Sequence, residues 1–190
     1  MPIDLIANPS LDRTRAYGAA ERAILSLDKA QEAMRAISSW PGYAETPLVE
    51  LADLAREAGV ASIAYKHEAH RFGLKSFKAL GGAYAIERLV AAHKASGSGK
   101  PLAVTSATDG NHGRSVAWGA ERHGVRAIIY IHETVSQGRA DAIAAYGAEV
   151  RRVPGNYDDA VRAAAQAAGD AATASAGALL VRQASDAATL

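Results

Sequence analysis

The chain has 190 residues, enough for one well-filled domain or for one domain with part of another. Its formal net charge of +1 and its 22% of charged residues give no electrostatic reason to expect a nucleic acid or a membrane surface as partner. Because the sequence holds no cysteine, disulfides, Cys-ligated metals and Cys nucleophiles are excluded. The N-terminus does not resemble a secretory signal and no apolar run reaches membrane-spanning length, so we expect a cytoplasmic location.

The first 60 residues have an irregular pattern, with a helix predicted near 27–38 and a break at Pro41-Gly42. Beyond that point short apolar runs alternate with helical periods, as is typical of βαβ units and a parallel sheet. Strands are predicted at 61–68, 101–108, 126–132, 149–155 and 178–183, and helices at 76–96, 110–124, 136–147 and 157–170. We therefore expect an α/β fold with an open, mainly parallel sheet and helices on both faces.

Two short motifs do not support the chemistry that they first suggest. The sequence "GSGK" at 97–100 is no phosphate loop, because the flanking positions of that motif hold Lys94 and Pro101. In "HEAH" the residues His67 and His70 are three apart in a predicted strand, which directs them to opposite faces. We expect no metal site from these residues.

The helix predicted at 76–96 carries a lysine beside glycines. With Ser76 as N-cap, its hydroxyl can accept a hydrogen bond from an amide of the first turn. Lys78 then shares a face with small residues, at the i+3, i+4 and i+7 positions. These are Gly81, Gly82 and Ala85, and a neighbouring face suited to packing holds Phe77, Leu80 and Tyr84.

Two adjacent glycines inside a helix each cost about 0.5–1 kcal/mol relative to alanine, so we expect a compensating interaction. One alternative is a flat ligand or a close backbone approach beside Lys78. The other is tight helix–strand packing at the glycines, while the lysine extends into solvent.

A second feature is the strand-to-helix turn in "SATDGNHGRSVAW", residues 106–118. Free amides at a helix start bind carboxylate or phosphate groups, and Asn111 adds a donor and an acceptor. Such turns lie at the carboxyl ends of strands, where open α/β sheets bind ligands. The alternative is an ordinary Asp-Gly turn with an Asx cap.

Three motifs together carry a resemblance, and their order and spacing are specific. "ETPL" at 45–48, "YKHEAHRFGLKSFKALGGAYA" at 65–85 and the turn at 106–118 resemble the fold type II pyridoxal-phosphate enzymes, the tryptophan synthase β-like family. Within this family the sequences of these motifs are most similar to those of the diaminopropionate ammonia-lyases. Serine and threonine dehydratases usually have a small residue in the turn where this chain has Asp109.

The resemblance implies a cofactor, pyridoxal 5'-phosphate, and a role for each matching residue. Lys78 forms the Schiff base with the cofactor, a task that requires a neutral amine. Phe77 matches the aromatic residue before this lysine, and Asn111 matches the residue that hydrogen-bonds the cofactor's phenolic oxygen. The turn expected to hold the carboxylate of a small amino-acid substrate contains Thr108, Gly110 and His112.

The same resemblance implies β-elimination of ammonia from 2,3-diaminopropionate, which gives pyruvate and a second ammonia. Asp109 is the expected general base at Cα, and Asp186 is the candidate for a second acid that serves the other substrate enantiomer. A threonine or serine dehydratase-like lyase is the alternative activity. For Asp186 a plain surface loop is the alternative interpretation.

This sequence lacks two features of the family. We find no glycine-rich loop for the cofactor phosphate and no partner for the pyridine nitrogen in the 190 residues. The resemblance therefore covers the N-terminal half of such an enzyme. We expect residues 1–75 to belong to the larger, incomplete domain, and 76–190 to form the subdomain with the lysine and the asparagine turn. A complete enzyme is expected to be a homodimer, and an inactive fragment that acts only by association is the further alternative.

Overall fold

A computed structural model of the protein describes residues 7–173 and 177–180. Contacts between Cα atoms divide the chain into two units, Met1–Ala36 and Ile37–Leu190, which we treat separately. The first unit holds α1 (Ala19–Ile24) and most of α2 (Leu27–Ser38), so the helix predicted near 27–38 is confirmed. No residue of α1 or α2 is buried. The boundary expected near residue 75 stays a prediction.

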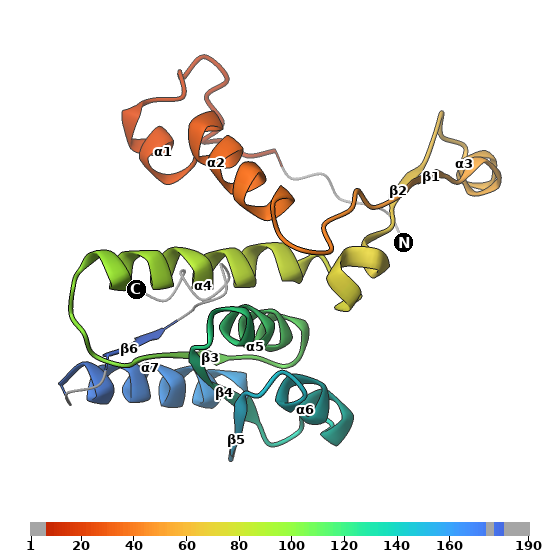
Figure 1. Ribbon diagram of the computed structural model, residues 1–190. Helices are drawn as coiled ribbons and strands as arrows, with labels where there is room; N and C mark the ends of the chain where they lie inside the picture. The colour runs from red at the N-terminus through yellow and green to blue at the C-terminus, as the bar shows by residue number, and fades with distance from the viewer. Residues whose placement is uncertain (1–6, 174–176, 181–190) are drawn as a thin grey trace. The chain divides into compact units, whose positions relative to one another are not determined.

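The second unit contains a parallel sheet and a short antiparallel hairpin (Figure 1). The hairpin pairs β1 (Leu48–Glu50) with β2 (Ala64–Lys66), and α3 (Ala52–Ala58) lies between the two strands in the chain. Four strands form the sheet in the order β5-β4-β3-β6, and every neighbouring pair is parallel. The remaining elements are the 3-10 segment η1 (Glu68–Gly73), α4 (Lys78–Ala95), β3 (Leu102–Ala107), α5 (Asn111–His123), β4 (Arg126–His132), α6 (Gln137–Ala144), β5 (Glu149–Val153), α7 (Tyr157–Thr173) and β6 (Gly177–Leu180).

Helices cover both faces of the sheet, as the sequence predicts. Successive side chains of a strand point to opposite faces, and β4 divides its apolar residues in this way. Ile129 and Ile131 pack in one core cluster with residues of α4, α5 and α6. Tyr130 packs with residues of α7. Helix α7 lies on the other face of the sheet (Figure 1). The expected α/β architecture is confirmed.

Helices α4 and α5 approach each other through small residues. A Cβ added at Gly119 would lie 2.8 Å from the Cα of Ala83, and one added at Gly82 would lie 2.3 Å from Ser115 Oγ. Neither position can carry a side chain at this distance. The close contact fixes the start of α4 relative to α5, and it compensates for Gly82 by helix–helix packing, not by the helix–strand packing expected from the sequence.

The strand predicted at 61–68 is shorter than expected, and one inference from it is wrong. Strand β2 ends at Lys66 and the 3-10 segment η1 follows. A 3-10 turn places residues three apart on the same side. The rings of His67 and His70 accordingly meet edge to face with centroids 4.6 Å apart, not on opposite faces.

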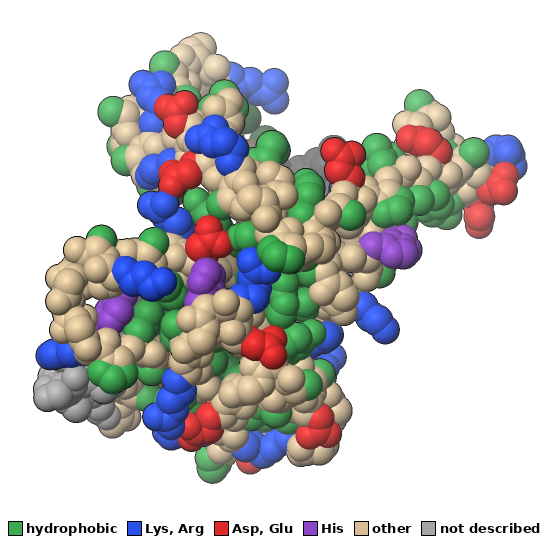
Figure 2. Space-filling view, in the orientation of Figure 1, with side chains coloured by type: hydrophobic (Ala, Val, Ile, Leu, Met, Phe, Trp, Pro, Cys, Tyr) green, Lys and Arg blue, Asp and Glu red, His purple; other side chains and the backbone are tan. Residues whose placement is uncertain are grey.

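Apolar side chains are exposed around the β1–β2 hairpin and α3 (Figure 2). They include Leu48, Val49, Leu54, Val60 and Tyr65. Within the residues that the structure describes, no helix is both long and apolar enough to cross a membrane.

Candidate functional site

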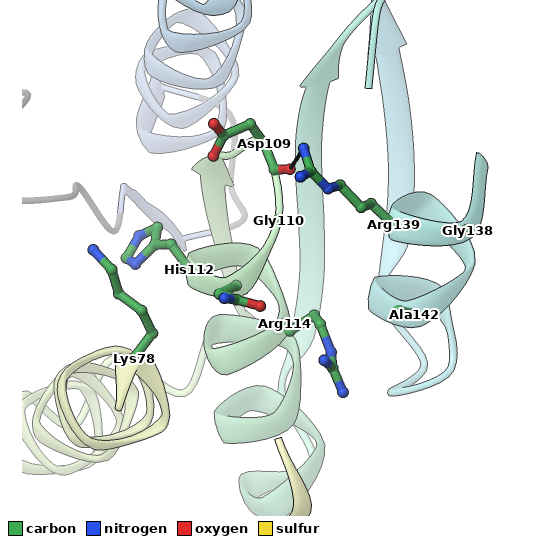
Figure 3. Close-up of a pocket in the computed structure, with 9 residues that line it drawn as sticks. Lys78, Asp109, Gly110, His112, Arg114, Gly138, Arg139 and Ala142 are labelled. Atoms are coloured by element: carbon green, nitrogen blue, oxygen red, sulfur yellow. Dashed lines mark hydrogen bonds between the residues drawn. The ribbon is translucent and has the colours of Figure 1, made fainter. Parts of the chain in front are cut away.

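A pocket of about 340 Å³ lies where α4, the turn after β3 and α6 meet (Figure 3). It brings together five of the residues selected from the sequence: Lys78, Asp109, Gly110, Asn111 and His112. Four further lining residues were not selected: Arg114, Gly138, Arg139 and Ala142. The predicted parallel sheet places the segment after β4 at the same edge as the asparagine turn. Only the strand order of the structure makes the two segments neighbours and brings Gly138 and Arg139 to the pocket. Asp186 lies outside the described residues.

Lys78 is the first residue of α4, and its side chain runs from the helix toward the turn that holds His112 (Figure 3). The N-cap of α4 is Phe77, so the expectation that Ser76 is the N-cap is wrong. Ser76 Oγ nevertheless accepts a hydrogen bond from the Lys78 amide at 3.2 Å, which is the contact with a first-turn amide that the sequence predicts. The Lys78 amine lies 5.5 Å from the ring centroid of Phe77. Phe77 is 59% exposed, so the packing role expected for this ring is wrong for the described chain.

The two glycines after Lys78 have different surroundings. Gly82 is buried against Ser115, as described above. Gly81 is exposed, and no heavy atom lies within 4 Å of the position that its Cβ would take. The surface of α4 beside Lys78 is therefore open, which leaves room for a flat group next to the amine.

The segment before Lys78 has a strained backbone. Phe72 and Lys75 have positive φ angles of 48° and 56°, and they are the only non-glycine residues with this conformation in the part of the chain that the structure describes. The left-handed region costs an ordinary residue about 1–2 kcal/mol. Such strain persists only where surrounding contacts fix the backbone.

One set of fixing contacts surrounds Arg71, which is 7% exposed. Its Nε and Nη2 donate to the two carboxylate oxygens of Glu68 at 2.9 and 3.0 Å, and its Nη1 donates to the carbonyl of Ala44 at 3.0 Å. Thr46 Oγ1 accepts from Arg71 Nη2 at 2.9 Å and donates to Glu68 at 2.6 Å. The Arg71 hydrogen bond outweighs burial and lowers the Glu68 pKa to about 2. The network thus joins the "ETPL" motif to the residues before Lys78.

A second set of contacts holds the Phe72 ring. Its centroid lies 5.0 Å from that of Trp118 on α5 and 5.7 Å from that of Trp40. The guanidinium carbon of Arg122 lies 4.8 Å from the ring centroids of both tryptophans. This aromatic cluster anchors the strained segment to α5, the helix that begins at the pocket.

The asparagine turn is held mainly by one hydroxyl group. Thr108 is fully buried, and its Oγ1 accepts hydrogen bonds from the amides of Gly110 and Gly113, both at 3.0 Å. A Cβ at Gly113 would lie 2.3 Å from Thr108 Cγ2, so this position requires glycine. From α6, Arg139 Nη1 donates to the Asp109 carbonyl at 3.4 Å (Figure 3). Thr108 therefore shapes the turn from inside.

Asn111 and Asp109 are both exposed and line the pocket. Asn111 opens α5, where the unpaired amides of the first turn give a partial positive charge. The Asp109 carboxylate makes no hydrogen bond or ion pair within the described residues, and Figure 3 shows it pointing away from the Arg139 guanidinium. The Asp109 carboxylate is therefore open to contact with a ligand in the pocket. His112 is 8% exposed.

The fold and the pocket define a class of protein. A family model described as "Pyridoxal-phosphate dependent enzyme" matches residues 39–190. The chain belongs to this family, whose cofactor is pyridoxal 5'-phosphate.

Within the family, diaminopropionate ammonia-lyases are among the most similar proteins. The enzyme of Escherichia coli K12 is 44% identical over 133 residues, which are 64% of this chain and 33% of the relative. That of Salmonella typhimurium is 38% identical over 169 residues, 80% of this chain and 42% of the relative. A crystal structure of the Escherichia coli enzyme, in complex with an aminoacrylate-PLP azomethine reaction intermediate, superposes on this chain with a TM-score of 0.72 and 38% sequence identity. The match covers 82% of this chain and 41% of the crystallised chain. The chain thus spans less than half the length of these relatives.

The residues of the pocket fit the cofactor on one side. The Lys78 amine can bond to an aldehyde carbon, the open surface at Gly81 leaves room for a ring, and the Asn111 amide can hydrogen-bond a ring oxygen. In the described residues no group of three or more His, Asp or Glu side chains is placed to hold a metal ion.

Proposed function

We propose that this chain carries the lysine-bearing part of a pyridoxal-phosphate-dependent lyase. The proposed reaction eliminates one ammonia from 2,3-diaminopropionate, and hydrolysis by one water then gives pyruvate and a second ammonia. The observation that carries the proposal is the single pocket lined by Lys78, Asp109 and Asn111, since these residues come from two separate motifs. The similarity to diaminopropionate ammonia-lyases supports this substrate over others.

In the proposed site Lys78 would hold the cofactor at its aldehyde carbon, Asn111 would hydrogen-bond the phenolic oxygen, and Phe77 would lie beside the lysine. Bound pyridoxal phosphate supplies an electron sink for negative charge at the substrate Cα. The start of α5, with Gly110 and His112, binds the substrate carboxylate through amides and the helix dipole. Thr108 contributes to this binding by fixing the turn, because its hydroxyl is already bonded to two amides.

Asp109 is the proposed general base that removes the Cα proton of the substrate. Its carboxylate lines the pocket, and no cation within the described residues competes for it through an ion pair. Asp186 is proposed as a second acidic residue, which serves the other substrate enantiomer. This proposal rests on the sequence alone. For the complete protein we further propose a cytoplasmic homodimer, which mass measurement in solution under native conditions can test.

The first experiment tests cofactor attachment. The purified chain is mixed with pyridoxal phosphate, the visible absorption is recorded, and the mixture is reduced with borohydride and mapped by mass spectrometry. We expect a pyridoxyl group on Lys78 and none on neighbouring Lys75, and no specific adduct in Lys78→Arg. Absence of a band and of an adduct would contradict the proposal and favour a fragment that acts only by association.

The second experiment tests the substrate class. Release of ammonia and of the 2-oxo acid is compared for three substrates, in the parent chain and in Asp109→Asn. The 2-oxo acid is pyruvate for 2,3-diaminopropionate and serine, and 2-oxobutanoate for threonine. We expect diaminopropionate to be preferred and the preference to depend on Asp109. Turnover of diaminopropionate by Asp109→Asn equal to that of the parent would contradict the assignment of Asp109 as the base. A preference for threonine would favour the dehydratase alternative.

A further inference from the structure

We propose that Thr46, Glu68 and Arg71 are positioning residues for Lys78: their buried network sets the strained backbone of residues 72–77 and thereby the place where the lysine enters the pocket. The inference rests on the proposed function for the role of Lys78 in cofactor binding. The positioning itself concerns only the chain's own atoms. None of the three network residues lines the pocket, so they act through the backbone.

The network is built for rigidity. The Arg71 guanidinium makes hydrogen bonds to the Glu68 carboxylate, the Thr46 hydroxyl and the Ala44 carbonyl, all between 2.9 and 3.0 Å. Lys66 Nζ adds a hydrogen bond to the Thr46 carbonyl at 2.5 Å. A bidentate Arg–carboxylate pair has a fixed geometry and holds both partners in one orientation. Arg71 is therefore a fixed point on the chain seven residues before Lys78.

The strain begins at that fixed point. The backbone leaves Arg71 at φ −65° and ψ 107° and enters the left-handed region at Phe72, with φ 48° and ψ 23°. The amide of Leu74 returns a hydrogen bond to the carbonyl of Arg71 at 2.9 Å and closes this turn. Lys75 is the second left-handed residue. Loss of the fixed Arg71 removes one of the two sets of contacts that hold these unfavourable conformations, the other being the aromatic contacts of Phe72.

The strained segment is connected to the pocket at its other end. The Leu74 carbonyl accepts a hydrogen bond from Arg114 Nη1 at 3.3 Å, and Arg114 lines the pocket from α5. Ser76 Oγ accepts the amide of Lys78 itself at 3.2 Å. Displacement of the turn therefore changes both the start of α4 and its distance from the asparagine turn. A network that served only global stability would not need these local connections.

The matched variants are Thr46→Val and Thr46→Ser. Valine has the shape of threonine without the hydroxyl, so it breaks the hydrogen bonds to Glu68 and Arg71, whereas serine retains them. Glu68→Gln is a second variant, which keeps the size of the side chain and removes the charge.

Two measurements on the unloaded chain report on the position of Lys78. Amide hydrogen exchange compares residues 72–79 with the core strand β4, and limited acetylation followed by mass spectrometry compares Lys78 with exposed Lys100. We expect Thr46→Val and Glu68→Gln to speed exchange in 72–79 by about ten-fold while β4 is unchanged. We expect the Lys78/Lys100 labelling ratio to shift in both variants and to stay at the parent value in Thr46→Ser.

Three outcomes would overturn the inference. They are unchanged exchange and labelling in Thr46→Val, an equal rise of exchange in 72–79 and β4, or the same defect in Thr46→Ser. Cofactor attachment by the parent chain is measured separately. If pyridoxal phosphate does not attach to Lys78, the proposed function fails, while the exchange and labelling results still decide whether the network positions the lysine.

Discussion

Two segments supply the pocket, and they are fixed in different ways. The turn from Thr108 to Gly113 is held from within, by one buried hydroxyl that accepts two nearby amides and by a glycine that leaves room for it. The segment 71–77 is held from outside. Thr46, which lies 25 positions before Arg71 in the chain, hydrogen-bonds the Arg71 guanidinium, and the rings of Trp40 and Trp118 pack against Phe72. The site of Asn111 is thus local in origin, whereas the site of Lys78 depends on distant side chains.

This difference implies that the two halves of the pocket can be perturbed separately. Substitution in the asparagine turn acts on a few neighbouring residues, which the parallel sheet continues to support. Substitution in the network of Thr46, Glu68 and Arg71 acts on a 3-10 segment that is interrupted by non-helical backbone angles at Arg71 and Phe72. The following variants separate the two cases, from the largest expected effect to the smallest.

Removal of the Arg71 guanidinium has the largest expected effect. Arg71→Met leaves the Glu68 carboxylate, whose side chain is only 20% exposed, without its partner. Loss of one member of a buried ion pair costs about 3 kcal/mol. Urea unfolding of the parent and the variant measures this difference.

A matched control for Arg71→Met exists in the same chain. Arg56 and Asp53 form a pair with the same i,i+3 spacing and the same 2.9 Å distance, but their side chains are 76% and 93% exposed. Arg56→Met should change the free energy of unfolding by less than about 1 kcal/mol. Equal effects of the two substitutions would show that burial of the network has no energetic consequence.

The adjacent glycines of α4 should respond in opposite directions. Gly82→Ala brings a Cβ within 2.3 Å of Ser115 Oγ, and overpacking of this kind destabilises by about 1–3 kcal/mol. Gly81→Ala meets no atom within 4 Å and should stabilise the helix by about 0.5–1 kcal/mol. Thermal unfolding of both variants measures the two signs. Destabilisation by Gly81→Ala would contradict the open surface beside Lys78.

The asparagine turn should depend mainly on the Thr108 hydroxyl. Thr108→Val leaves the amides of Gly110 and Gly113 without their acceptor, at a cost of about 1–2 kcal/mol, and Thr108→Ser keeps it. Amide exchange should rise at 109–113 in the valine variant and remain unchanged at 72–79. A rise of exchange in both segments would contradict the inference that the two halves of the pocket can be perturbed separately.

The smallest expected effect is a pH dependence. The Glu68 pKa is lowered from 4.5 to about 2, so its ionised form contributes stability that is fully present above pH 4.5 and is lost as pH falls through that value toward 2. The quantity to compare is the free energy of unfolding of the parent minus that of Glu68→Gln. After allowance for partial exposure, this difference should be about 1 kcal/mol smaller near pH 3 than near pH 5. A constant difference would mean that Glu68 has its ordinary pKa.

Sequence patterns predicted the βα alternation because the period of the apolar residues is a local property. They also predicted the pocket residues that share a motif, since Asp109, Gly110 and Asn111 follow one strand directly. The 3-10 turn at His67 and His70 was missed, because a short apolar run before it has the composition of a longer strand. Arg139 was missed because the adjacency of two loops at one sheet edge depends on strand order.

The sequence by itself determined the alternating elements and the parallel class of sheet. It also determined that a lysine and an asparagine turn lie in motifs that match one enzyme family. Only the tertiary structure decided which glycine packs and which is open, and that Thr108 holds the turn from inside. It alone decided that Arg71, Glu68 and Thr46 meet. Local periodicity is fixed by neighbouring residues, whereas these contacts join positions that the chain brings together only on folding.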